Sequence, residues 1–298
     1  MRLKKIVDEF STLILVKDAD FNQLGMSTSF YMKNGVLSYL NDEKYLVSVL
    51  NNTNITAVIT TELIANQLKD SKLGIVISTN PKKDFYIIHN FLVDSRFYYP
   101  LLENQIDSSS IISKEAIIAA NNVEIGKNCL IEPGVIINEG VSIKDNVIIR
   151  SGTILGTSGF QFMNSESTIL SVKTGGTLLI KDNVEIQHNC CVDKGVFGGA
   201  TLINKDVKID NFVHIAHDCQ IGERTLITAG VKFGGRTVVG QDCWLGINAV
   251  ISNGINIGDR VKVSLGSVVT TNVDDDQTVT GNFAIDHKKF IDFIKSIR

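Results

Sequence analysis

Aliphatic or aromatic residues recur at every sixth position from about residue 106 onwards. One series runs unbroken from Ile203 to Val269, and shorter series with the same period begin at Ile106, Ile125 and Ile180. A period of six fits neither the 3.6-residue turn of a helix nor the alternation of an ordinary strand. It predicts a prism-shaped solenoid in which each hexad forms one short strand and one corner, and three hexads close a coil.

The fourth residue after most of these positions is small or β-branched, so we expect two inward-pointing side chains in each hexad. Four cysteines occupy this second position and are expected to pack in the core; they are Cys129, Cys190, Cys219 and Cys243. Cys191 lies one step out of register, and nothing beside it in the sequence suggests a nucleophile or a metal site. Glycine, asparagine and aspartate between the hexads are expected where the chain bends.

Two insertions interrupt the repeat. Leu155 and Ile180 are separated by 25 residues where six would suffice, and Val192 and Ile203 by 11. Loops that leave a regular scaffold are where function tends to concentrate. We therefore expect the longer insertion to lie beside a functional histidine of a neighbouring subunit.

The flanks of the repeat lack the six-residue period. In residues 1–100, short apolar runs alternate with helix-like stretches, which predicts a small α/β domain. Residues 101–280 would form the solenoid. In residues 281–298 apolar side chains return at helical spacing, and we expect a short amphipathic helix that caps the open end of the last coil.

Composition narrows the classes of function. Hydrophobic residues make up 44% of the 298 positions and charged residues 20%, which supports a sizeable core and excludes wholesale disorder. The net charge is −3 and no basic run exceeds three residues, so no nucleic-acid partner is expected. Apolar runs of four or five residues exclude a membrane span. Since a secretory segment is absent and the five cysteines form no paired framework, we expect a reduced, cytoplasmic bacterial setting.

Histidine is the residue type that carries the candidate chemistry, because the common nucleophile, phosphate-binding and zinc-protease motifs are absent. His214 and His217 fall in the string DNFVHIAHDCQIG. His217 is third in its hexad, so its side chain can reach solvent or a neighbouring subunit. His188 takes the same position in another hexad and is the main rival. From the residues alone, a solvated surface histidine is the simpler interpretation.

Four motifs resemble a known enzyme family. IDNFVHIAHDCQIG is similar to the IDN-x-x-x-IAHN-x-x-IG signature of the lipid A pathway N-acyltransferases, which transfer a 3-hydroxyacyl chain to UDP-3-O-acylglucosamine. CVDKG resembles the T-I-D-R-G stretch of that family, LGTSGFQF its G-x-x-G-F-G-F loop, and LSYLNDEKYL its base-binding segment. The resemblance implies a mainly β chain: a left-handed parallel β-helix of hexapeptide repeats with a small N-terminal α/β domain and a C-terminal capping helix.

The resemblance also implies roles for individual residues. His217 matches the general base of the family, and Asp210 matches a carboxylate that supports it. Tyr39 and Tyr45 match two aromatic side chains that sandwich uracil. A histidine suits removal of a proton from an attacking amine, and two rings can stack on both faces of a base. The remaining substrate-binding positions implied by the motifs are Asp42, Asn211, Asp193, Gly159 and Phe160.

Departures from the family pattern leave the substrate open. Asp42 stands where the family has an asparagine that reads the base, and Gly254 stands where many members carry a second histidine. A related group of similar architecture acylates dTDP-linked amino-dideoxysugars. We therefore predict an N-acyltransferase acting on a nucleotide-activated amino sugar, with a dTDP-amino-dideoxyhexose slightly preferred. The alternative substrate is UDP-3-O-acylglucosamine in the lipid A pathway.

Donor, assembly and cofactors follow from the same resemblance. The donor would be acyl-CoA or acyl carrier protein, without a permanently bound cofactor or metal, and the protein would be a homotrimer with active sites between neighbouring prisms. A different class remains open: a non-catalytic or metal-dependent β-helix protein, in which His188, His214 and His217 would meet at a subunit boundary. The tyrosine pair in a separate first domain favours the nucleotide-sugar enzyme.

Overall fold

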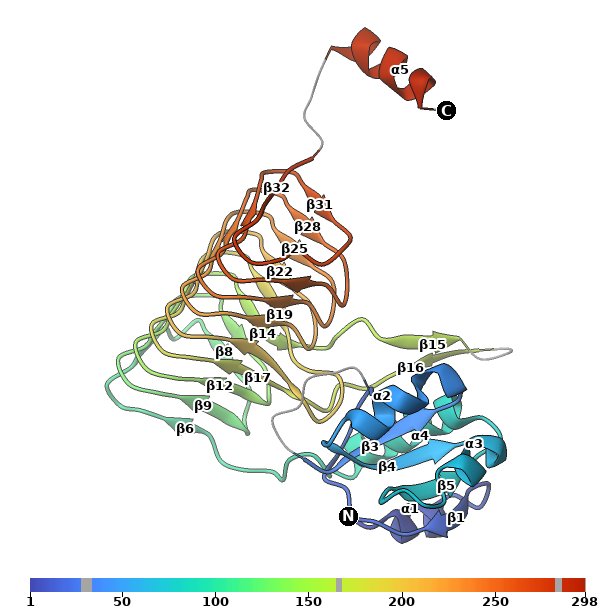
Figure 1. Cartoon of the computed structure of the whole chain (residues 1–298). Helices are drawn as coiled ribbons and strands as arrows, with labels where there is room; N and C mark the ends of the chain where they lie inside the picture. Colours follow the sequence, from blue (N-terminus) through green and yellow to red (C-terminus); the bar gives the residue numbers. More distant parts are fainter. Residues whose placement is uncertain (28–33, 165–167, 282–285, 298) are drawn as a thin grey trace.

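The computed structural model describes residues 1–27, 34–164, 168–281 and 286–297. An α/β unit precedes a triangular prism of short parallel strands, and a helix follows the last coil (Figure 1). The chain is thus mainly β. It has the prism that the period of six predicts and is the left-handed β-helix of hexapeptide repeats that the family resemblance implies. Within the described ranges, no helix combines the length and the apolar character needed to cross a bilayer.

The N-terminal unit is built on a five-stranded sheet in the order β1-β5-β4-β3-β2, in which only β1 runs antiparallel to its neighbour. Its strands are β1 (Ile14–Lys17), β2 (Gln23–Leu24), β3 (Val36–Leu40), β4 (Ile55–Thr60) and β5 (Gly74–Ile77). Its helices are α1 (Leu3–Glu9), the 3₁₀ turn η1 (Glu43–Tyr45), α2 (Leu46–Asn51), α3 (Glu62–Gln67) and α4 (Pro81–Asp94). One core cluster joins α1 and α4 to the sheet and another joins α2 and α3, so both faces of the sheet are covered and its strands are apolar almost throughout.

The prism has three faces, each a parallel sheet with strands of two to four residues. The first face contains β7 (Ile111–Ile112), β10 (Leu130–Ile131), β13 (Ile148–Ile149), β18 (Glu185–Ile186), β21 (Lys208–Ile209), β24 (Leu226–Ile227), β27 (Trp244–Leu245), β30 (Lys262–Val263) and β32 (Thr278–Val279). The second contains β8 (Ile117–Ile118), β11 (Ile136–Ile137), β14 (Ile154–Thr157), β19 (Cys191–Asp193), β22 (His214–Ile215), β25 (Lys232–Phe233), β28 (Val250–Ile251) and β31 (Val268–Val269). The third contains β6 (Gln105–Ile106), β9 (Val123–Ile125), β12 (Val141–Ile143), β17 (Thr177–Ile180), β20 (Ala200–Ile203), β23 (Gln220–Ile221), β26 (Val238–Val239) and β29 (Asn256–Ile257).

The register confirms that three hexads close one coil. Ile209 pairs with Ile227 on the first face, and Ile215 pairs with Phe233 on the second, each three hexads further along the chain. The side chains at the repeat positions point inward and form one continuous buried core. The four in-register cysteines are buried in this core as expected, and each thiol donates to a carbonyl oxygen of a later corner, such as Cys219 to Gly234 at 3.3 Å.

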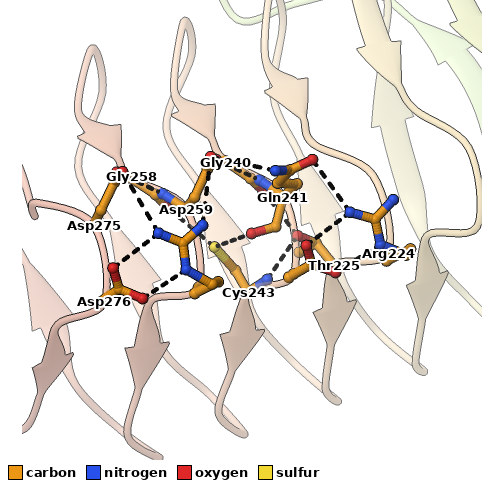
Figure 2. A network of polar contacts seen from close by, with 11 residues as sticks. Arg224, Thr225, Gly240, Gln241, Cys243, Gly258, Asp259, Asp275 and Asp276 are labelled. Carbon is orange, nitrogen blue, oxygen red and sulfur yellow. Dashed lines mark hydrogen bonds and ion pairs between the residues drawn. The ribbon is translucent and has the colours of Figure 1, made fainter.

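One edge of the prism, between the third and first faces, carries a stack of left-handed residues that we call the corner ladder. Its members have φ between 54° and 62° and are Asn128, Asn146, Asn183, Asp206, Arg224, Asp242, Arg260 and Asp276. In the early coils their amides hydrogen-bond to one another, for example Asn183 to Asp206 at 2.9 Å. In the late coils they alternate as Arg–Asp ion pairs (Figure 2), with Arg224 to Asp242 at 2.7 Å and Arg260 to Asp276 at 2.6 Å.

Both insertions dock on the N-terminal unit. The longer one forms the hairpin β15 (Phe162–Asn164) and β16 (Ile169–Ser171), which lies beside α4 in Figure 1. From α4, Asn90 donates to the Ser171 carbonyl at 2.8 Å and accepts from the Lys173 amide at 2.8 Å. The shorter insertion buries Phe197 against Phe85 and Tyr86, with ring centroids 5.2 and 6.1 Å apart. The insertions therefore join the two units into one core.

The C-terminal helix α5 (His287–Ser296) forms, but the expectation that it caps the last coil is wrong within a single chain. None of its described side chains is buried, and the helix stands clear of the prism in Figure 1. Phe290 and Phe293 remain about half exposed. An amphipathic stripe predicts that a helix forms, but it does not say which surface the stripe covers.

His89 gives the joint between α4 and the longer insertion a pH dependence. The ring is fully buried, its Nε2 donates to the Lys173 carbonyl at 2.7 Å, and its Nδ1 accepts from the Tyr98 hydroxyl at 2.6 Å. Burial lowers the pKa of His89 to about 4. An unfolded histidine titrates near 6.5, so between these values the unfolded chain binds a proton that the folded chain does not.

Stability should therefore fall as the pH drops from about 6.5 to about 4, by up to about 3 kcal/mol from this one group. His89→Gln can keep one donor and one acceptor without titrating, and it should flatten the pH dependence of the urea-unfolding midpoint over this range. His287→Gln on the exposed helix α5 is the matched control and should retain the wild-type slope. Equal slopes in all three proteins would contradict the assignment.

Candidate active site

His217 lies at the edge between the second and third faces, two residues beyond the inward Ile215 at the end of β22. The side chain is only about a tenth exposed. Its Nδ1 is 2.8 Å from Oδ2 of Asp218, which takes the left-handed corner position with φ 59°. A carboxylate at this distance accepts the Nδ1 proton, so the lone pair of the neutral ring is on Nε2.

Asp218 is itself held in place by the shorter insertion. Its Oδ2 accepts a hydrogen bond from the Val196 amide at 3.2 Å, and its own amide donates to the Thr201 hydroxyl at 2.9 Å. The carboxylate is mostly buried. A partner fixed on both sides keeps the imidazole in one orientation and one tautomer, which a base needs if its lone pair is to point at the substrate.

Two glycines leave room around the His217 ring. A Cβ at Gly159 would lie 2.8 Å from the Cβ of His217, and a Cβ at Gly235 would lie 2.6 Å from Nε2 and Cε1. Both approaches are closer than real carbon atoms tolerate, so only glycine fits without displacing the ring. Gly159 belongs to the longer insertion of the same chain. The first residues of this insertion therefore contact His217 within one chain, and the expected contact with a histidine of a neighbouring subunit stays a prediction.

Asp210 does not contact His217 within the chain, which corrects the role implied by the family resemblance. Its Oδ1 accepts from the amide and side chain of Asn211, at 2.7 and 2.8 Å. Asp210 follows β21 and Asn211 precedes the next strand, so both lie at the edge between the first and second faces. One hexad separates this edge from His217. The sequence signal for the true partner is the position itself, since Asp218 directly follows His217.

His188 lies at the same edge as Asp210, where its Nδ1 is 3.1 Å from Oδ1 of Asn211. It is about half exposed. His188, His214 and His217 therefore do not meet within one chain. A three-histidine zinc site is not formed by the described residues of a single subunit.

Tyr39 and Tyr45 flank the start of η1 at the C-terminal end of β3. Tyr39 is half-buried against Phe85, with ring centroids 5.1 Å apart, whereas Tyr45 is 45% exposed. Burial raises the pKa of Tyr39, and the positive charge of Arg236 acts in the opposite direction. Arg236 follows Gly235 on the prism, and its amide donates to the His217 carbonyl at 2.8 Å. Tyr39 thus lies within electrostatic reach of the coil that adjoins His217.

The carboxylate of Asp42 is bonded within its own turn. One carboxylate oxygen accepts from the Lys44 amide at 3.0 Å as the cap of η1, and the other pairs with the Lys44 ammonium at 2.7 Å. These hydrogen bonds to Lys44 lower the pKa of Asp42. The carboxylate is therefore ionised and already partnered, in contrast to the neutral amide that the family places there.

The remaining predicted positions differ in exposure. Phe160 is 87% exposed and its ring packs on Phe162 at 4.8 Å, so the start of the longer insertion presents apolar surface to the outside. Asp193 is buried, and its Oδ1 accepts from the Thr157 hydroxyl at 2.5 Å. Burial raises the pKa of Asp193. Its side chain lies near Cys191, beside which the sequence indicates neither a nucleophile nor a metal site.

Comparison with known proteins adds to this geometry. The family described as bacterial transferase hexapeptide (six repeats) matches residues 122–157 and 200–235, and the hexapeptide repeat of succinyl-transferase matches residues 236–271. The fold is similar to that of the UDP-N-acetylglucosamine acyltransferase from Campylobacter jejuni, with a TM-score of 0.50, 18% identity, and coverage of 65% of this chain and 81% of that one.

The curated relatives are similar over a shorter stretch. UDP-3-O-acylglucosamine N-acyltransferase 2 of Sulfurimonas denitrificans is 44% identical over 69 residues, which is 23% of this chain and 22% of the relative. UDP-3-O-acylglucosamine N-acyltransferase of Phocaeicola vulgatus is 41% identical over 71 residues, 24% of this chain and 20% of the relative. The similarity spans about a fifth of the length of these relatives. The six-residue repeat, the three-faced prism and the family matches together show that the prism is built of hexapeptide repeats of the bacterial transferase type, over residues 122–157 and 200–271.

Proposed function

We propose that the protein is an N-acyltransferase that moves a 3-hydroxyacyl group from a thioester, on coenzyme A or acyl carrier protein, to the amine of a UDP-linked glucosamine derivative. The observation that carries the proposal is the His217–Asp218 pair, with the ring of His217 lying between two glycines and its Nε2 beside Gly235. The names of the curated relatives support UDP-3-O-acylglucosamine as the acceptor. They favour this alternative over the dTDP-linked sugar that was slightly preferred from the sequence.

The chemistry requires one base and one oxyanion donor. The amine nitrogen attacks the thioester carbonyl carbon, Nε2 of His217 takes a proton from that nitrogen, and the C–S bond breaks as the amide forms. The imidazolium then returns the proton to the departing thiolate. Asp218 stabilises the transient positive charge through Nδ1. The Gly235 amide lies beside the ring and has no backbone acceptor within the described residues, which supports it as the oxyanion donor.

A nucleoside diphosphate is the ligand proposed for the surface between the tyrosines and His217. No carboxylate pairs with the half-buried Arg236 in the parts of the chain that the structure describes. The charge of Arg236 acts on Tyr39, and its backbone amide is bonded to the His217 carbonyl. Its guanidinium would therefore suit a diphosphate held between the nucleobase and the sugar. The proposed order along the site is therefore Tyr39 and Tyr45 on uracil, Arg236 on phosphate and His217 at the amine.

A homotrimer would complete sites of this kind, and outward apolar side chains on the prism support it. Ile117, Val250 and Val268 are 41–61% exposed on the second face, and Ile111 and Trp244 are 68% and 48% exposed on the first. Such rows of exposed apolar residues mark surfaces that pack against another molecule. Cyclic closure of three copies would bury them.

The base assignment predicts that His217→Ala lowers kcat by about 10²–10⁴-fold with little change in KM for the sugar, because the lost interaction acts on the proton in the transition state. Asp218→Asn should cause a smaller loss. His188→Ala, at another edge of the prism, is the control and should keep near wild-type kcat. Steady-state assays with UDP-3-O-acylglucosamine and an acyl thioester measure all three. A His217→Ala variant with more than about a third of wild-type kcat would rule out the role.

The nucleotide subsite predicts that the two ends of UDP can be separated by mutation. Tyr45→Ala removes a stacking face worth on the order of 1–3 kcal/mol and should weaken uridine and UDP alike, by about ten-fold or more. Arg236→Ala should weaken UDP but leave uridine unchanged. Calorimetric titration of both ligands into both variants gives the comparison. Loss of uridine affinity in Arg236→Ala, or none in Tyr45→Ala, would overturn this placement.

The assembly predicts a solution mass of three times 32.7 kDa. Light scattering coupled to size exclusion at micromolar concentration measures it directly. A stable monomer or dimer that is active would show that the site needs no neighbouring prism.

A further inference from the structure

Three side chains, of types that bind metals in other proteins, converge on the outer side of the second face. Cys191 and Asp193 both belong to β19, where residues two apart share a side of the strand. His214 begins β22, and the parallel register pairs it directly with Cys191. The three come together because the next coil stacks His214 beside Cys191, although the two are 23 positions apart along the chain.

The distances suit a small metal ion. The thiol sulfur, a ring nitrogen and a carboxylate oxygen all lie within 4.8 Å of one another. Ligands at about 2.0–2.3 Å from Zn²⁺ lie roughly 3–4 Å apart in a tetrahedron, so modest rotation of the three side chains closes the site. Sulfur, imidazole and carboxylate together form a ligand set that zinc accepts, whereas calcium and magnesium prefer oxygen alone.

Two features around the cluster point to a cation. Asp193 is only 5% exposed, yet no lysine or arginine forms an ion pair with it in the described part of the chain. A buried carboxylate without a cation is costly. The Thr157 hydroxyl, on the adjacent strand β14, donates to Oδ1 of Asp193 and lies 3.4 Å from the Cys191 sulfur. It thereby orients the carboxylate in the way that outer partners orient metal ligands.

We infer that Cys191, Asp193 and His214 bind one zinc-like dication per chain, with a fourth coordination position open to the outside of the second face. The site does not include the His217–Asp218 pair, although the charge of His217 acts on Asp193, and it does not depend on the proposed acyl transfer. Asp193, which the family resemblance implies is a substrate-binding residue, is here a ligand. The cluster could not be recognised in the sequence, because Cys191 and His214 belong to different coils and become neighbours only when the coils stack.

The test uses tag-free, full-length protein that has been treated with a chelator and titrated with Co²⁺ and Zn²⁺. One Co²⁺ per chain should bind and give a thiolate-to-metal charge-transfer band in the near ultraviolet. Cys191→Ser should abolish the band, and His214→Ala should abolish stoichiometric binding. Thr157→Val keeps all three ligands but loses their outer hydrogen bond, and it should weaken binding by about 10–100-fold.

His188→Gln is the matched control, because it removes an exposed histidine of another edge and should bind Co²⁺ like the wild type. Zn²⁺ should raise the melting temperature of the wild type and of His188→Gln but not of Cys191→Ser, which also shows whether that variant folds. Absence of stoichiometric binding at micromolar metal, or an unchanged charge-transfer band in Cys191→Ser, would overturn the inference. Loss of acyl transfer in a His217 variant would leave these readouts unaffected, so the two proposals fail separately.

Discussion

The structure depends on the closure of each coil within three hexads. A short strand must be followed by a turn three times in each coil, and at most corners one residue adopts a left-handed backbone conformation. Asparagine, aspartate and glycine tolerate this conformation best, which explains their frequency between the hexads. When the corners close each coil in this way, adjacent coils align in register and the inward side chains stack into one core.

That regular frame makes the two insertions informative. The shorter insertion places Phe197 in the core of the N-terminal unit and, one residue earlier, directs the Val196 amide at Asp218. The contact that holds the first unit on the prism is therefore adjacent to the contact that fixes the candidate base. The longer insertion also links the candidate base to the first unit. Near its start Gly159 adjoins His217, and near its end Lys173 is hydrogen-bonded to α4.

The sequence sufficed for the prism because a six-residue period over many hexads has no other structural explanation, and it placed the inward cysteines correctly. It also identified the His217 string. It did not identify Asp218 as the partner of His217, because the resemblance pointed to Asp210. Asp210 lies one hexad earlier, and the position of the turn between the two hexads decides that it occupies a different edge of the prism. The Cys191 cluster was missed for a related reason, since residues in different coils become neighbours only through the register of the stacked strands. The position of α5 could not be predicted because amphipathicity specifies a stripe and not its partner.

The corner ladder changes chemistry along the prism axis. Its early members are joined by neutral amides, whose hydrogen bonds do not respond to ionic strength, and its late members by exposed Arg–Asp pairs, whose attraction dissolved salt screens. Along this one edge, the early half of the ladder is therefore little affected by dissolved salt, whereas the late half, which leads to α5, is weakened by it. Rising salt would therefore weaken the contacts of this edge in the C-terminal coils before those in the coils nearest the α/β unit.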